Sequence, residues 1–318
     1  MIESPEQQMQ RWDDLKALQE HYADFRDFYH DCSVDLLGFV PTDEQYDIAQ
    51  YVAYGAHYAM VQAQRGEAKT TITGCFAVWC LIHDPWFRVL IISAGTPLAK
   101  QISVWCIQII NGMPELECLR VDPSHPGARA SVEAYDIHHT LKGAEKSPSI
   151  ACLGITSTSQ GYRADLLIPD DIESSKNSKT AHMREQLRHL TKDFTSINSK
   201  GRIIYLGTPQ STESIYNELP ARGFDVRIWP GRYPTLEEEP NYNGHLAPSI
   251  VAQMTQDPSL RTGGGPLGDR GKPTDPGMMS EVQLTKKEVD QGRSYFNLQH
   301  MLDTALSDSD RYPLKEAT

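Results

Sequence analysis

The chain has 318 residues, of which 39% are hydrophobic and 23% charged, a composition of folded proteins that excludes wholesale disorder. Its longest uninterrupted apolar run, 75–82, is far too short to cross a membrane, and no basic-then-apolar signal pattern opens the sequence. We therefore expect a cytosolic protein without a membrane partner. The six cysteines include no CxxC pair, which indicates free thiols, and His138 with His139 alone does not supply a zinc site.

The net charge of −12 is unevenly distributed along the chain. Residues 1–50 carry 12 acidic and 3 basic side chains, whereas residues 51–318 carry 30 acids and 27 bases and are nearly neutral. A static, high-affinity DNA-binding protein would show a basic surface, which this balance does not favour. A motor that grips and releases DNA repeatedly is not excluded.

Residues 1–38 form an acidic arm in which apolar residues recur at helical spacing. The segment 41–45 then opens a helix predicted over 46–54. The side-chain amide of Gln45 offers both a donor and an acceptor, which can recognise the edge of an adenine. On its own, however, Gln45 favours the alternative of an ordinary solvated helix start.

The most informative stretch is 59–71, in which an apolar run ends in a small, polar turn before a buried helix over 72–81. This order predicts a strand, a phosphate loop and a helix, whose backbone N–H groups cradle phosphate oxygens. Lys69 would reach the β- and γ-phosphates, and the Thr70 hydroxyl would ligate Mg²⁺. The residues expected to bind nucleotide are Gln45, Gln64, Arg65, Gly66, Glu67, Ala68, Lys69, Thr70 and Thr71.

The phosphate loop departs from the general pattern at its outer glycines. Alanines stand in both places, Ala63 and Ala68, and only Gly66 remains. An alanine is tolerable at either place if the backbone there is helical or extended. The alternative interpretation of the stretch is a glycine turn followed by a solvated lysine.

Beyond this helix, apolar segments predict strands at 88–93 and 149–155, with a helix over 97–110 between them and a candidate hairpin at 134–141. A further apolar segment, 166–168, predicts a strand with Asp170 and Asp171 at its carboxyl end, where open α/β sheets bind ligands. Asp170 would hold Mg²⁺ through water, and Asp171 or Glu173 would orient the attacking water as general base. The alternative is that these acids cap the next helix.

Residues 181–199 are predicted to form a helix with Arg184, Arg188 and Lys192 on one face. This face is either a basic stripe or a solvated surface, and the solvated surface is favoured.

Segment 201–210 predicts another apolar strand that ends in small and polar residues. Gly207, Thr208 and Gln210 lie where nucleic-acid motors sense the γ-phosphate and couple hydrolysis to movement. Beyond Phe224 the periodicity weakens. We expect a mobile loop near 262–277, where glycine and proline are dense, and a short helical end over 286–304.

Together, these motifs resemble the ATPase half of the large terminase subunit of tailed phages, closest to the DNA maturase B type of short-tailed phages. The resemblance covers roughly residues 20–315 and rests on 41–45, 62–69, 89–94, 163–165 with 170–171, 202–210, 228–230 and 272–276. It implies an α/β fold, a P-loop NTPase of the RecA-like (ASCE) type with a mostly parallel central sheet flanked by helices. The implied domains are an acidic helical arm over 1–38, an ATPase core over 39–224 and a linker or lid subdomain over 225–318.

By this resemblance the chain would be a motor that hydrolyses ATP with Mg²⁺ and pumps double-stranded DNA into a procapsid through the portal. Arg65 would contact the γ-phosphate, and Arg163 would be an arginine finger that acts on the ATP of the neighbouring subunit in a homo-oligomeric ring. The implied partners are double-stranded DNA, a small terminase subunit and the portal. The implied location is the cytoplasm of an infected bacterium, with a monomer as the alternative in isolation.

The family's second half is a nuclease, and we expect it to be missing here, so that DNA cutting is absent. The late acids Asp303, Asp308 and Asp310 lie in a polar tail without a strand to align them. Two other functions stay open. A superfamily-2 helicase-like translocase shares these motifs but needs a second RecA-like lobe, for which about 100 residues after Phe224 are too few. A non-hydrolysing assembly module, motivated by the loop alanines, would dock through the acidic arm.

Overall fold

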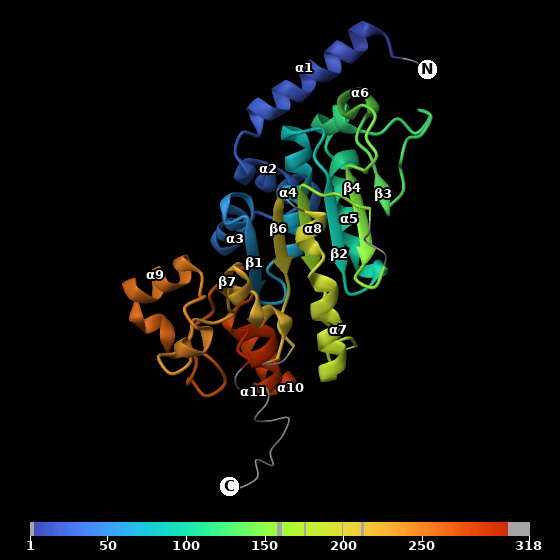
Figure 1. Cartoon of the computed structure of the whole chain (residues 1–318). Helices are drawn as coiled ribbons and strands as arrows, with labels where there is room; N and C mark the ends of the chain where they lie inside the picture. The colour runs from blue at the N-terminus through green and yellow to red at the C-terminus, as the bar shows by residue number, and fades with distance from the viewer. Residues whose placement is uncertain (1–2, 158–160, 175, 199, 211–212, 305–318) are drawn as a thin grey trace.

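A computed structural model describes residues 3–157, 161–174, 176–198, 200–210 and 213–304 (Figure 1). Its centre is a seven-stranded sheet in the order β3-β4-β2-β5-β6-β1-β7. All neighbouring strands pair in parallel except β3 and β4. The strands are β1 Tyr58–Ala63, β2 Val89–Ser93, β3 Ala134–Tyr135, β4 Ile150–Gly154, β5 Leu166–Asp170, β6 Arg202–Leu206 and β7 Asp225–Trp229.

The strand order determines the class of the fold. β6 lies between β1, which leads into the phosphate loop, and β5, which ends at Asp170. An additional strand between these two is the feature of the RecA-like (ASCE) P-loop fold, so the predicted α/β class is confirmed. The central strands are buried on both faces, which explains their continuous apolar sequences.

Helices flank this sheet and fill the space between it and the surface. α1 runs across one end of the molecule, and α10 and α11 lie at the other (Figure 1). None of the helices in the described ranges is both long and apolar enough to cross a bilayer. The helices are α1 Pro5–His21, α2 Phe25–Asp31, α3 Asp43–Tyr54, α4 Lys69–His83, α5 Thr96–Gly112, α6 His139–Lys142, α7 Ala181–Thr191, α8 Phe194–Ile197, α9 Pro248–Gln256, α10 Glu281–Gln291 and α11 Arg293–Phe296.

The acidic arm is helical, as predicted, and it is also part of the core. Tyr22, Phe25 and Phe28 are buried in the same apolar cluster as the central strands. The indole of Trp79 on α4 donates a hydrogen bond of 2.8 Å to the carbonyl of Tyr22. The arm is therefore packed against the phosphate-loop helix rather than appended to the sheet.

Two local predictions were wrong. The hairpin at 134–141 is instead the two-residue strand β3 followed by the short helix α6. The helix over 181–199 breaks into α7 and α8 around Lys192, and Ser199 lies outside the described residues. The Thr191 hydroxyl donates to the carbonyl of Arg188 at 2.9 Å, a local hydrogen bond that competes with continuation of a helix.

The sheet continues beyond Phe224, where we had expected a linker to start. β7 pairs in parallel with β1 from Asp225 to Trp229. It is an edge strand whose residues alternate between exposed and buried, so it lacks the continuous apolar run that marked the central strands. The region outside the sheet therefore begins after Trp229.

Segment 262–277, predicted to be a mobile loop, is held by buried ion pairs. Arg270 is completely buried, and its guanidinium pairs with Glu238 at 2.5 Å and with Glu288 at 2.9 Å. Arg232 is equally buried and pairs with Glu281 at 2.6 Å. Glycine and proline content correctly predicted the turns here but could not show which charges fix them.

We predict that Arg270→Ala lowers the free energy of unfolding by about 3–5 kcal/mol, because it leaves the buried Glu288 and the largely enclosed Glu238 without their cation. The matched control is Arg293→Ala, which removes the half-exposed pair with Asp269 and should cost about 0–1 kcal/mol. Urea unfolding of both variants measures the difference. Equal losses would show that Arg270 does not fasten the segment.

Candidate nucleotide-binding site

The predicted phosphate loop connects β1 to α4. Gly66 has a φ of +104°, a conformation that favours glycine, and the loop ends at Ala68, whose side chain does not cap α4. The first N–H groups of α4 are therefore open toward the loop, as a phosphate site requires. The Lys69 ammonium donates to the carbonyls of Ala63 at 2.5 Å and Gln64 at 3.1 Å. Lys69 thus lies within the curve of the loop.

The condition for tolerating an alanine is met at one of the two loop positions and not at the other. Ala63 is extended, as expected, and pairs with Trp229 in the sheet. Ala68, however, has a φ of 52° and is left-handed. A residue with a Cβ in this conformation costs about 1–2 kcal/mol, so the alanine that replaces the pattern's glycine strains the loop.

Two oxygen ligands lie where the sequence predicted a magnesium site. The Thr70 hydroxyl, in the first turn of α4, donates to the carboxylate of Asp170, the last residue of β5, at 3.4 Å. Burial, and next the charge of Asp171, raise the pKa of Asp170 to about 7, while Lys69 opposes the rise. A hydroxyl and a carboxylate are oxygen ligands of the kind that Mg²⁺ prefers, so Thr70 and the buried Asp170 fit this ion.

The two candidates for the general base differ in their surroundings. Glu173 is buried, and its carboxylate accepts hydrogen bonds from Gln210 N at 3.2 Å, Ser214 Oγ at 2.9 Å and Ile215 N at 2.9 Å. Burial raises the pKa of Glu173, and these hydrogen bonds oppose the rise. Its oxygens are thus engaged with the chain that follows β6.

Asp171 is placed differently. It directly follows β5 with a φ of 41°, and its N–H donates to Leu206 O of β6 at 2.9 Å. Burial lowers the pKa of the Lys69 ammonium, and the negative charge of Asp171 opposes this change. Left-handed backbone at a residue other than glycine is concentrated at functional sites, and here both Ala68 and Asp171 have it.

The predicted coupling residues follow β6, which neighbours both β1 and β5. A Cβ on Gly207 would lie 2.5 Å from the Tyr216 ring, so only glycine fits there. The Gln210 side chain donates to Thr208 O at 3.0 Å, and the Gln210 backbone donates to Glu173. A displacement of this segment would therefore pull on the end of β5.

Three predicted nucleotide-binding residues direct their side chains into the protein. Gln45 is fully buried rather than solvated; its Oε1 accepts from Thr42 N at 3.2 Å at the start of α3, and its buried Nε2 has no hydrogen-bond partner among the described residues. Gln64 Nε2 donates to Glu67 Oε1 at 2.6 Å, and both side chains are buried. Only the backbone of Gln64 and Glu67 is available to phosphate. The carbonyl of Thr71 accepts from Trp105 Nε1 at 3.1 Å.

The predicted arginines are both exposed, on different parts of the fold. Arg65 is in the phosphate loop itself. Arg163 precedes β5, at the amino edge of the parallel sheet, whereas the loop and Asp170 follow carboxyl ends. Arg163 therefore lies away from its own chain's site.

The candidate basic stripe on α7 is largely neutralised. Arg184 pairs with Glu213, and Arg188 pairs with Glu218 at 2.6 Å and with Glu185 at 3.4 Å. These pairs favour the alternative of a solvated face.

The sequence analysis missed the side chains that surround the phosphate loop from other segments. Asp275 accepts a hydrogen bond from the Thr42 hydroxyl, and His300 Nδ1 lies 3.4 Å from Gln64 Oε1. Both are buried and more than 200 residues from their partners in sequence. The only signal was that 272–276 belongs to the motifs shared with the large terminases.

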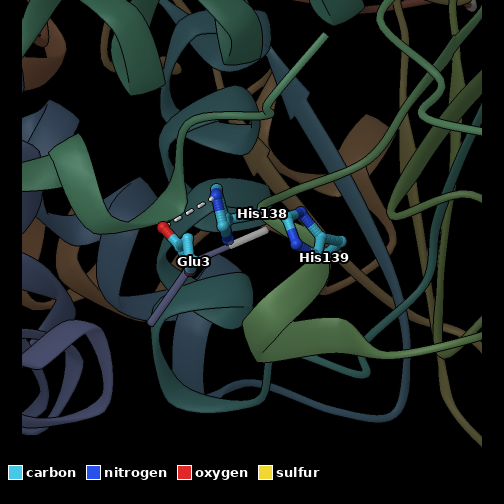
Figure 2. Close-up of side chains that lie close together, drawn as sticks. All are labelled: Glu3, His138 and His139. Atoms are coloured by element: carbon cyan, nitrogen blue, oxygen red, sulfur yellow. Dashed lines mark ion pairs between the residues drawn. The ribbon is translucent and has the colours of Figure 1, made fainter. Parts of the chain in front are cut away.

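The His138–His139 pair meets Glu3 from the start of the chain, as Figure 2 shows. Glu3 accepts from Arg11 at 2.6 Å and from the Thr140 hydroxyl at 2.8 Å. His138 Nδ1 accepts from Thr140 N at 3.3 Å, which places the proton on Nε2, 3.6 Å from Glu3. The acid is already paired with a cation and the imidazole nitrogen is protonated, so this cluster is a hydrogen-bonded contact between the arm and α6.

We predict that Ala68→Gly leaves the free energy of unfolding unchanged or raises it by up to about 1 kcal/mol, because glycine relieves the left-handed strain. The control is Ala77→Gly in the buried interior of α4, which should cost about 1 kcal/mol or more. Urea unfolding compares the two. If both substitutions destabilise equally, Ala68 is not strained.

No family model matches the chain. It is 38% identical over 282 residues to the large terminase subunit of Enterobacteria phage T3, a match that covers 87% of this chain and 46% of that protein. The chain thus spans about half the length of the curated relative that it matches.

Two solved structures are similar at low identity. The large terminase of bacteriophage HK97 is 12% identical with a TM-score of 0.45, over 83% of this chain and 50% of that one. The ATPase domain of the large terminase of Thermus phage P74-26 is 10% identical with a TM-score of 0.39, over 83% and 99%. Superpositions this loose say nothing of individual residues. By sequence, the chain is a relative of the large terminase subunits.

Proposed function

We propose that the chain is the ATP-hydrolysing motor domain of a viral terminase large subunit, which moves double-stranded DNA into a procapsid through the portal. The observation that carries the proposal is the convergence of Lys69, Thr70 and Asp170 at the carboxyl ends of β1 and β5. The similarity to the T3 protein supports the packaging role. Because the chain spans less than half of that relative, the small subunit, the portal and the infected cell's cytoplasm are part of the proposal.

The geometry supports a division of labour among the residues. Lys69 exchanges its bonds to the loop carbonyls for bonds to the nucleotide's phosphates, which its position within the loop permits. Thr70 and Asp170 would hold Mg²⁺, which would supply positive charge next to the phosphates. Asp171 orients the attacking water, since its position beside Lys69 is less enclosed than that of Glu173.

Coupling to movement follows from the same contacts. Glu173 joins the end of β5 to Gln210 and Ser214, so a change at Asp171 is transmitted to the segment after β6. Arg163, on the opposite edge of the sheet, acts on the ATP of a neighbouring subunit, which requires a homo-oligomeric ring. Arg65 contacts the γ-phosphate from within the loop.

The helicase-like alternative needs a second RecA-like lobe. Within the part of the chain that the structure describes, the strands form one sheet, and residues 230–304 are helices, turns and isolated bridges. The described residues thus hold one RecA-like lobe, and the similarity to the T3 protein supports the packaging motor. The non-hydrolysing module remains the competing function, because Ala68 strains the loop.

We predict that Lys69→Ala lowers the ATP hydrolysis rate at least about 100-fold, because the charge that stabilises the transferred phosphoryl group is lost. Phosphate release is measured over a protein concentration series, with and without linear double-stranded DNA. The control is Lys100→Ala, an exposed lysine on α5 paired with Glu133, which should retain the wild-type rate.

A wild-type rate that rises per subunit with concentration and with DNA supports the ring motor. Undiminished turnover in Lys69→Ala would overturn the proposed site. If wild type neither hydrolyses ATP nor gains thermal stability from Mg-ATP, the assembly module replaces the motor.

We predict that Asp171→Asn lowers turnover by about 10²–10⁴-fold while the unfolding free energy stays close to that of wild type, because a water-orienting base is lost. Glu173→Gln should instead lower stability by about 1–3 kcal/mol, because a buried acceptor of three hydrogen bonds becomes partly a donor. Hydrolysis and urea unfolding are measured on both variants. A Glu173→Gln protein that is stable but inactive would transfer the role of base to Glu173.

A further inference from the structure

Three acidic side chains from distant segments are buried together beside the phosphate loop. Glu67 of the loop is 0% exposed, Asp275 from the region after the sheet 4%, and Glu44 of α3 8%. The charge of Asp275 acts on Glu67, and both carboxyl groups are buried. Two buried carboxyl groups that act on each other in this way do not both ionise, so one of them carries a proton.

The surrounding contacts indicate which group holds that proton. Asp275 accepts hydrogen bonds from the Thr42 hydroxyl and from the backbone N–H groups of Gly277 at 3.1 Å and Met278 at 3.2 Å, an environment for a carboxylate. Glu67 accepts a hydrogen bond from Gln64 through Oε1, and its buried Oε2 has no donor partner among the described residues. The proton therefore belongs to Glu67.

A second contact reaches the loop from the last described turn, Asn297–Met301. His300 is buried, and burial lowers its pKa to about 4, so its imidazole is neutral at physiological pH. Its Nδ1 can donate to Gln64 Oε1 at 3.4 Å, and Gln64 in turn donates to Glu67. The Gln64 amide is packed against Gly231, where a Cβ would lie 2.3 Å from Oε1.

We propose that Asp275 and His300 are positioning residues for the phosphate loop. Through Glu67 and Gln64, the region after the sheet sets the shape of the loop and so regulates nucleotide binding. The inference rests on the proposed nucleotide site, but the contacts it invokes exist without nucleotide. Met279 reinforces them, since its methyl group lies 3.3 Å from where a Cβ of Gly66 would be.

The charges around Glu67 determine how the contact depends on pH. Burial first, and then the charge of Asp275, raise the pKa of Glu67 to about 7, while the Gln64 hydrogen bond and Lys69 oppose the rise. Burial likewise raises the pKa of Glu44, so the second acid adds little negative charge. The titratable and charged groups around this cluster are Tyr29, Glu44, Asp47, Arg65, Lys69, Tyr233, Asp275 and His300.

The proton on Glu67 determines the direction in which pH changes the stability. The folded protein retains it up to about pH 7, whereas an unfolded glutamate loses it near 4.5. Stability from this contact is therefore complete below 4.5 and declines as the pH rises to about 7. Above that, two adjacent carboxylates repel each other and the loop loosens.

The test is amide hydrogen exchange of residues 63–69 in the full chain without nucleotide, from pH 4.5 to 8.5, corrected for the intrinsic base-catalysed rate. In wild type, protection should fall by up to about tenfold per pH unit between about pH 4.5 and 7 and level off above pH 7. Asp275→Asn should abolish this dependence, because it removes the negative charge that raises the pKa of Glu67. Glu67→Gln should do the same, and His300→Ala should lower protection of the loop at every pH.

The control is Asp269→Asn, the same change six residues earlier at a half-exposed pair with Arg293, which should keep the wild-type profile. A wild-type profile that is flat, or one that Asp275→Asn and Glu67→Gln leave unchanged, overturns the inference. Because exchange is measured without nucleotide, the expected profiles in a protein that binds no ATP would support the positioning role and overturn only the proposed function.

Discussion

The adjacency of β1, β6 and β5 is the constraint on which the site depends. Parallel strands end at the same edge, so one interposed strand brings Lys69 and Thr70 from one element to Asp170 from another, about 100 residues later. No side chain needs to reach across the sheet. β6 lies between β1 and β5 and pairs with both strands. Its carboxyl end is therefore next to both strand ends, where a coupling segment is expected.

The second constraint is charge. Lys69 is the cation among Asp170, Asp171 and Glu67, and burial lowers its pKa while these acids raise it. Acids that outnumber a buried cation must be protonated, hydrogen-bonded or neutralised by an ion. Asp170 is suited to the ion, Glu67 to the proton and Glu173 to hydrogen bonds. These three carboxylic acids therefore have three different roles, and the surroundings of each side chain determine its role.

The sequence predicted the parts of the site that are local. Lys69, Thr70 and Asp170 follow strands whose apolar runs are unmistakable, so their meeting could be inferred from periodicity and topology alone. Ala68 could not be judged, because its cost depends on a backbone angle of 52° that no spacing reveals. β7 was missed because this edge strand contains exposed and partly buried residues and so lacks a continuous apolar run. The anchored segment at Arg270 was missed because the ion-pair partners of this buried arginine are distant in sequence.

The region after Trp229 is best understood as part of the nucleotide site. Its backbone contacts begin at once: the N–H of Gly231 donates to His300 O at 2.7 Å, and Thr274 Oγ1 donates to Pro230 O at 2.6 Å. These bonds fix the segments that carry Asp275 and His300 against the phosphate loop. The phosphate loop is therefore held from two sides, by the strand β1 that leads into it and by segments that follow the sheet in sequence.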